Sequence, residues 1–156
     1  MENETRKRPL GVVILTCGPD LVAQGCRPGS LGGAFAFDTT YRGKNYDSCV
    51  DLETIAETPS WSETDDFPPL SPREAIRSAR GELSALVTDP QYWTLREIKL
   101  MPGGSQDKWI YVVSFEGPAT SPYRGVSDEF HMMVLMDGKA VKPRVYSLPV
   151  SAPAAP

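Results

Sequence analysis

The spacing of apolar residues after position 71 predicts one amphipathic helix. Apolar residues recur every three or four positions along one stripe, and charged residues fill the opposite arc; the apolar members are Ile76, Ala79, Leu83, Leu86 and Val87. Ser71 and Glu74 have the spacing of a capping box, and Pro72 falls at the first helical position. Asp89-Pro90 ends the helix, because a residue before proline disfavours the helical region. Gly81 indicates either a close approach to another backbone or a tolerated defect that costs about 1 kcal/mol.

Four strand-like runs follow the helix. The run from Tyr92 to Leu100 changes face between its halves, which indicates a β-bulge. The runs Trp109 to Phe115 and Phe130 to Met136 carry apolar groups on both faces, so we expect interior strands. Asp137-Gly138 predicts a hairpin turn. The returning run, Lys139 to Tyr146, should be an edge strand because it contains a proline.

These elements predict an α+β fold, with one helix packed on a curved four-stranded antiparallel meander. We divide the chain into a loop-rich acidic N-terminal extension over residues 1–70, a helix-plus-antiparallel-sheet domain over residues 71–147, and a Pro/Ala-rich tail over residues 148–156. The extension can add one or two strands, at Val12 to Leu15 and at Ala34 to Phe37. A length of 156 residues with 40% hydrophobic content supports a single packed domain.

Negative charge is concentrated before the helix. Residues 1–72 hold six basic and eleven acidic residues, a net charge of −5, whereas residues 73–156 hold ten basic and nine acidic, a net charge of +1. From Asn45 to Ser71 there are seven carboxylates and no basic residue, which is typical of a solvated connection. Trp61 and Phe67 lie in this run, where they either dock it on its own domain or contact a partner. Without a basic stripe, nucleic acid is not an expected partner.

The N-terminal apolar run has two interpretations. Arg6-Lys7-Arg8 precedes Leu10 to Leu15, which is too short to cross a bilayer because a span takes about 20 residues. The run is either a targeting segment, with Cys17 accepting a lipid, or a buried strand of the fold. The chain would be exported or lipid-anchored if residues 1–17 are a signal, and cytoplasmic otherwise.

The three cysteines do not have the spacing of a metal site. No Cys-x-x-Cys pair is present, so a structural zinc ion is not expected, and no other cofactor is implied. Cys26 and Cys49 are candidates for a disulfide in an exported protein. Buried thiols in a reducing compartment are the alternative.

The sequence gives little support to catalysis. His131 is the only histidine, so any acid–base mechanism must use it. It alternates with Phe130 and Met132 along a strand, a setting typical of a half-buried packing residue. No Gly-x-Ser-x-Gly elbow is present. The long loop from Gly117 to Val126 offers Tyr123 and Arg124 as contact residues, because long loops on rigid sheets often carry binding groups.

The order of the C-terminal elements resembles a known class of domain. A helix over 72–87 is followed by strands over 95–100, 109–115 and 130–136, the last ending in Asp137, Gly138, Lys139, Ala140 and Val141. Residues 72–141 thus resemble PepSY-like and broader cystatin-like α+β domains. The resemblance implies an extracytoplasmic, non-catalytic module linked to peptidase regulation or to packing against partner proteins.

We therefore predict a non-catalytic protein-binding or assembly module, acting as an accessory or regulatory subunit with another protein as its partner. The predicted contact residues are Trp61, Phe67, Tyr123, Arg124 and His131. One alternative is a small-ligand carrier or enzyme with a pocket between helix and curved sheet, lined by aromatic residues such as Trp109, Tyr111 and Phe115. Another is a purely structural component of a larger assembly. The oligomeric state is left open.

Overall fold

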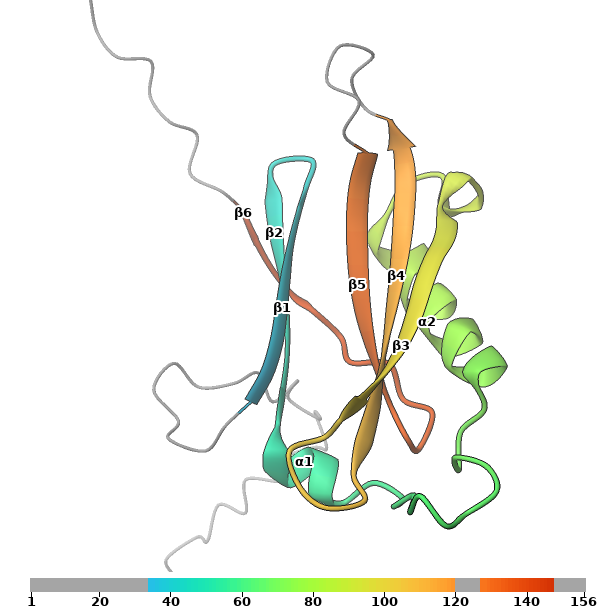
Figure 1. Ribbon diagram of the computed structural model, residues 1–156. Coiled ribbons are helices and arrows are strands. Elements are labelled where there is room, and N and C mark those ends of the chain that lie inside the picture. The colour runs from blue at the N-terminus through green and yellow to red at the C-terminus, as the bar shows by residue number, and fades with distance from the viewer. Residues whose placement is uncertain (1–33, 120–126, 148–156) are drawn as a thin grey trace, which may run out of the picture.

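The computed structural model describes residues 34–119 and 127–147 of the chain, which form two three-stranded antiparallel sheets and one long helix (Figure 1). Sheet A has the order β1-β2-β6, with β1 at Ala34–Tyr41, β2 at Lys44–Asp51 and β6 at Arg144–Ser147. Sheet B has the order β3-β4-β5, with β3 at Thr94–Pro102, β4 at Trp109–Ala119 and β5 at Ser127–Leu135. The helices are α1 at Leu52–Ala56 and α2 at Pro72–Leu86, and a 3-10 turn covers Pro90–Tyr92.

The long helix α2 begins as the sequence predicts. The Ser71 hydroxyl accepts a hydrogen bond from the Glu74 backbone N–H, and the Glu74 carboxylate accepts one from the Ser71 backbone N–H, so the capping box is confirmed. Ala75, Ala79 and Leu83 are fully buried, because they form the helix face that lies on sheet B. Among the described residues, no helix is both long enough and apolar enough to cross a bilayer.

The predicted four-stranded meander is wrong. The Asp137-Gly138 turn does form, with Gly138 at a φ of 88°, but the returning chain makes one isolated bridge to sheet B, between Val134 and Ala140. Pro143 has no backbone N–H to donate to a strand of sheet B, and after it the chain crosses to sheet A. There β6 pairs antiparallel with β2, which places Tyr146 opposite Asn45. Sheet B therefore keeps three described strands.

The prediction of a solvated connection from Asn45 onward is also wrong in part, because β1 and β2 form a hairpin there. The acidic run was interpreted as a solvated connection from Asn45 onward, yet its first part is strand β2. The turn residues Arg42 and Gly43 both have positive φ, as the type I′ turn of a two-residue β-hairpin requires. Along β2, Tyr46, Ser48 and Val50 are buried on one face. Asp47 and Asp51 carry carboxylates on the other face.

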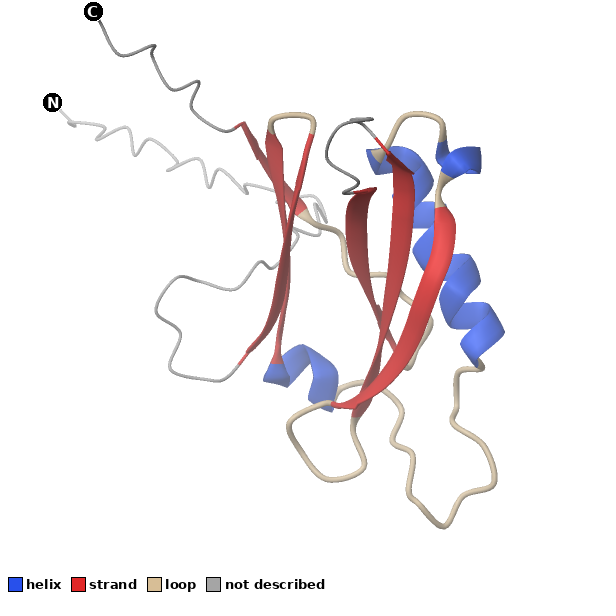
Figure 2. Ribbon diagram, turned by 45° about the horizontal axis from the view of Figure 1, so that its top comes forward, coloured by secondary structure: helices blue, strands red, loops and turns tan. Residues whose placement is uncertain are grey.

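The layers are sheet A, sheet B and α2, in that order (Figures 1 and 2). Strands β4 and β5 of sheet B are buried on both faces. On the helix side, residues of β4 and β5 form a core with α2, including Val113, Phe115, Phe130 and Met132; on the other side Ile110, Val112, Met133 and Leu135 pack against Val50 of β2 and Ile55 of α1. The hairpin end reaches past β5 to the helix side, where the Tyr41 ring meets the Trp93 ring edge to face at 5.5 Å.

Strand β3 is the outer strand of sheet B, and it contains the predicted bulge. Its pairing with β4 shifts register between Leu95 and Glu97, so the β-bulge is confirmed. The extra residue, Arg96, thereby reaches across β4 and forms an ion pair with Glu129 on β5, with 2.8 Å between its Nη1 and the Glu129 Oε2.

Candidate functional site

The segment between α1 and α2 is fixed to the domain at its first end by two tryptophans. Trp109, at the start of β4, donates a hydrogen bond from its indole Nε1 to the Trp61 carbonyl oxygen at 2.9 Å. The Trp61 backbone N–H donates to the Asp107 carbonyl oxygen at 2.8 Å. The two rings meet edge to face, with 5.4 Å between their centroids. Trp61 therefore docks the segment on its own domain, the first of the two alternatives left open by the sequence.

The second end is fixed just before α2. Leu70 is buried, and its carbonyl oxygen accepts a hydrogen bond from the Tyr111 hydroxyl at 3.1 Å. Burial raises the pKa of Tyr111 above its ordinary value, so the hydroxyl keeps the proton that it donates. Nine positions after Trp61, the chain is again part of the core.

Between these anchors lies the acidic loop, residues 62–69. Its first half is closed by reciprocal hydrogen bonds: the Ser62 N–H donates to the Asp65 carboxylate at 2.9 Å, and the Asp65 N–H donates to the Ser62 carbonyl at 2.9 Å. In its second half, Phe67 is 83% exposed, more than any other large hydrophobic residue among those described. The loop therefore presents an aromatic ring to solvent from a fixed base.

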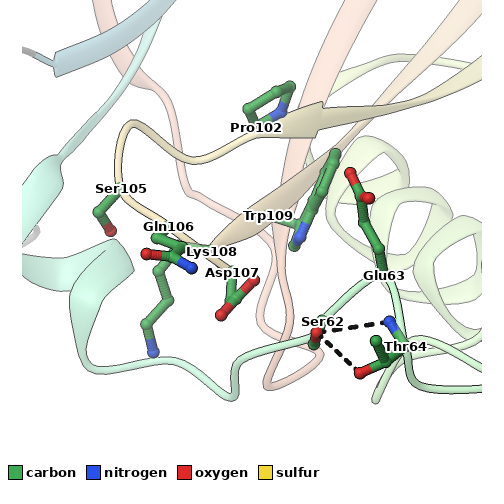
Figure 3. Close-up of a pocket in the computed structure, with 9 residues that line it drawn as sticks. All are labelled: Ser62, Glu63, Thr64, Pro102, Ser105, Gln106, Asp107, Lys108 and Trp109. Atoms are coloured by element: carbon green, nitrogen blue, oxygen red, sulfur yellow. Dashed lines mark hydrogen bonds between the residues drawn. The ribbon is translucent and has the colours of Figure 1, made fainter.

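A groove of about 510 Å³ lies beside the acidic loop (Figure 3). It runs between the loop and the β3–β4 connection; the lining residues are Ser62, Glu63, Thr64, Pro102, Ser105, Gln106, Asp107, Lys108 and Trp109. The Lys108 ammonium donates a hydrogen bond to the Thr58 carbonyl and runs away from the Trp109 ring. Glu63 and Asp107 make no side-chain hydrogen bond or ion pair with any described residue.

The wall opposite the acidic loop is held by close packing on α1. A Cβ added at Gly103 would lie 2.7 Å from the Ile55 Cγ2, and one at Gly104 would lie 2.6 Å from a Leu52 methyl carbon. Gly104 also has a φ of +84°, which side-chain-bearing residues rarely adopt. The β3–β4 connection therefore packs closely against α1, and it places Asp107 and Trp109 beside the groove.

The single histidine belongs to a different cluster, on the face of sheet B that is turned away from α2. The Ser114 Oγ and the His131 Nδ1 are 2.9 Å apart, and the His131 Nε2 is 3.9 Å from the Glu129 Oε1. The Phe37 ring covers the imidazole at 5.8 Å. Nearby on β3, the Lys99 ammonium donates to the Glu97 carboxylate at 2.8 Å and holds the pKa of Glu97 below its ordinary value.

Serine, histidine and glutamate are the residue types of hydrolase triads, but this cluster does not have the access that such chemistry needs. Ser114 is 2% exposed, because it lies on the central strand of sheet B. A nucleophile must reach a substrate carbonyl at about 3 Å. The cluster therefore joins β4 and β5 through a buried serine and the half-buried side chains of His131 and Glu129, and the exposed Arg96 pairs with Glu129.

The sequence-predicted site residues do not come together. Trp61 and Phe67 share one segment, whereas His131 pairs with Ser114, which lies five residues from Trp109 along β4, a separation of about 17 Å. Tyr123 and Arg124 lie outside the described residues. Sequence reasoning missed the groove residues Glu63, Asp107 and Lys108; Trp109 was assigned to a pocket under the helix. The run of turn residues from Pro102 to Ser105 was the sequence signal that could have pointed to this connection.

Cys49 lies on β2 and is disulfide-bonded. The other two cysteines, Cys17 and Cys26, are outside the described residues, so the pairing of Cys26 with Cys49 stays a prediction.

No group of three or more metal-ligating side chains occurs within the parts of the chain that the structure describes. In comparisons with protein-family models, with curated proteins and with solved structures, no match to this chain was found.

Proposed function

We propose that this chain is a non-catalytic protein-binding module that uses the acidic loop to hold its partner. Phe67 is the anchor, and the partner carries an apolar pocket for the phenyl ring within a positively charged surface. The observation that carries the proposal is the 83% exposure of Phe67 on a segment whose two ends are bonded into the core.

A rigid base is what makes the aromatic ring useful for binding. Ordering a loop at the moment of binding costs free energy, and pre-organised loops avoid most of that cost. Here Trp61 and Leu70 are already fixed, and the Ser62–Asp65 turn is already closed. A few side chains that enter pockets dominate the energy of many interfaces, so an exposed phenylalanine on a fixed base can serve as an anchor.

The charge around the anchor defines the partner's surface. Glu63, Asp65 and Asp66 are exposed, and no lysine or arginine occurs between residues 45 and 71. A surface with this sign attracts a basic partner, speeds the encounter and disfavours acidic surfaces. The proposal therefore includes a binding rate that decreases as salt concentration rises.

The ligand-pocket alternative has less support. The face of sheet B under α2 is packed with side chains: Leu83 of the helix, Tyr111 and Phe115 of β4 all belong to one buried cluster. A pocket between helix and sheet would need these residues to leave space for a ligand. Ser114, the hydroxyl nearest to the histidine, is also closed to substrate.

The disulfide at Cys49 indicates the kind of compartment in which such a module functions. Disulfides persist mainly in oxidising compartments, such as the outside of the cell or the periplasm. Cys49 is disulfide-bonded, which favours the exported interpretation of the N-terminal run over the buried strand of a reduced protein. The resemblance of residues 72–141 to PepSY-like domains implies the same setting, and it stays a prediction.

Capture of the partner from a native extract tests the proposal, with a second exposed aromatic residue as the matched control. Tyr92 is 63% exposed and lies outside the acidic loop, so Tyr92→Ala removes a similar side chain elsewhere. We expect wild type and Tyr92→Ala to capture the same protein, and Phe67→Ala to capture about tenfold less or none. Equal capture by Phe67→Ala, or equal loss in both variants, would contradict the proposal.

A further inference from the structure

We infer that the groove beside the acidic loop receives an arginine side chain of the partner. The inference rests on the proposed function and deepens it, because it names a second contact next to the Phe67 anchor. Two features carry it: an aromatic wall, and two carboxylates that have no hydrogen-bond or ion-pair partner among the described residues.

The aromatic wall is the Trp109 ring. Its position is set by the hydrogen bond from Nε1 to the Trp61 carbonyl and by the edge-to-face contact with the Trp61 ring. Tryptophan attracts cations to its face more strongly than other aromatic residues do, and a planar guanidinium can also stack on it. The groove therefore offers a pre-positioned surface for the flat end of an arginine side chain.

The charge in the groove is negative where a guanidinium would lie. Glu63 and Asp107 line the groove from its two walls, with the Trp109 ring between them in the view of Figure 3. Neither carboxylate has a hydrogen-bond or ion-pair partner among the described residues, whereas Glu74, Glu97 and Glu129 each have one. The single lysine of the lining is already engaged, because its ammonium is bound to the Thr58 carbonyl.

Arginine fits these groups better than lysine does. A guanidinium presents several N–H donors in one plane, so it can bond two carboxylates while its face lies on an indole ring. An ammonium is a more strongly hydrated point charge and gains less from a ring face. The hydroxyls of Ser62 and Thr64 and the Gln106 side-chain oxygen supply further acceptors along the lining.

A titration with a small probe tests the inference. The probe is the capped tripeptide acetyl-Gly-Arg-Gly-amide, followed by ¹H–¹⁵N NMR spectra of the full chain. We expect saturable shifts of the Trp109 indole N–H signal and of the Asp107 amide signal. The same peptide with citrulline, which has the shape of arginine without its charge, should cause no saturable shift, and the lysine peptide should bind more weakly.

Two charge-matched double variants complete the test. Glu63→Gln with Asp107→Asn removes both groove carboxylates, and asparagine tolerates the positive φ of 58° at position 107. We expect it to weaken binding of the arginine peptide about tenfold or more. Glu53→Gln with Asp89→Asn removes two exposed charges that lie outside both the groove and the acidic loop, and Asp89 has a positive φ of 54°, as Asp107 does. This variant should change the affinity by less than about twofold.

Several results would overturn the inference: equal binding of the arginine and citrulline peptides, unchanged affinity in the groove variant, or shifts that map away from Trp109. A response to methyl glucoside but not to the arginine peptide would also overturn it, because it would make the groove a carbohydrate site. Failure here is distinguishable from failure of the proposed function. If Phe67→Ala loses the partner while no peptide binds the groove, the proposed protein-binding function is supported and the arginine contact is refuted.

Discussion

The indole N–H of Trp109 donates to the backbone carbonyl of Trp61 at 2.9 Å, whereas the indole N–H of Trp61 is buried without a hydrogen-bond partner among the described residues. The two rings share one edge-to-face contact but differ in hydrogen bonding. This contact joins the start of β4 to the segment before α2 and is the first anchor of the acidic loop. It also fixes the Trp109 ring, which lines the groove.

That asymmetry predicts different costs for the same substitution at the two tryptophans. Trp109→Phe removes a donor and leaves the Trp61 carbonyl without its partner, whereas Trp61→Phe removes an N–H that makes no bond. Both lose similar ring area, so the difference isolates the hydrogen bond. We expect Trp109→Phe to be less stable than Trp61→Phe by about 1–2 kcal/mol in urea unfolding. Equal losses would mean that the carbonyl finds another donor.

Two glycine-to-alanine substitutions should act in opposite directions. Nothing lies within 4 Å of a Cβ built at Gly81, so this glycine is a tolerated defect of α2 rather than a close approach. Gly81→Ala should stabilise the protein by about 1 kcal/mol. Gly104→Ala should destabilise it by about 2 kcal/mol or more, because the residue has positive φ and Leu52 occupies the space. Chemical unfolding of both variants checks the pair, and a destabilising Gly81→Ala would speak against a solvent-facing position.

The capping box should make stability depend on pH. The hydrogen bonds from Ser71 lower the pKa of Glu74 below its ordinary value of 4.5. A carboxyl whose pKa is depressed by folding contributes stability above its unfolded pKa and loses it as pH falls through the folded value. The advantage of wild type over Glu74→Gln should therefore be full at neutral pH and shrink below about pH 4.5. Melting temperatures of both proteins across that range measure it, and a constant difference would refute the linkage.

The disulfide predicts a thiol count and a pairing. The chain has three cysteines, so one disulfide leaves one free thiol. Alkylation of the denatured protein should label one cysteine before reduction and three afterwards. Peptide mapping should then recover Cys26 joined to Cys49, and Cys49→Ser should cost about 2–4 kcal/mol of stability. A peptide joining Cys17 to Cys49 would show that the predicted pairing is wrong.

The helix could be predicted from the sequence because its signals are local. Ser71, Pro72 and Glu74 set its first turn, and Asp89-Pro90 follows its end, so no distant contact was needed. The bulge in β3 was also visible, since the apolar residues change face within a few positions. By contrast, the Asp137-Gly138 turn did not indicate which strand β6 would pair with. Asp137-Gly138 favours a hairpin locally, yet tertiary packing sends the chain to β2.

The candidate site depended on contacts that sequence spacing does not encode. Trp61 and Phe67 lie six residues apart in the same acidic run, yet one is docked and the other is 83% exposed. What separates them is Trp109, nearly fifty positions further along the chain, which binds Trp61. The strand β2 was missed for a related reason: its carboxylates mask the alternation of Tyr46, Ser48 and Val50, which face the core.

The environment of Phe67 tests the central claim most directly. Labelling the five phenylalanines with 4-fluorophenylalanine gives ¹⁹F signals, and the Phe67 signal is the one that Phe67→Ala removes. In the free protein we expect this signal to shift between H₂O and D₂O, as a solvent-exposed ring should, while the buried Phe115 and Phe130 signals do not. With the captured partner bound, the Phe67 signal should lose its solvent shift and move. A Phe67 signal that is insensitive to solvent in the free protein, or unchanged in the complex, would contradict the account.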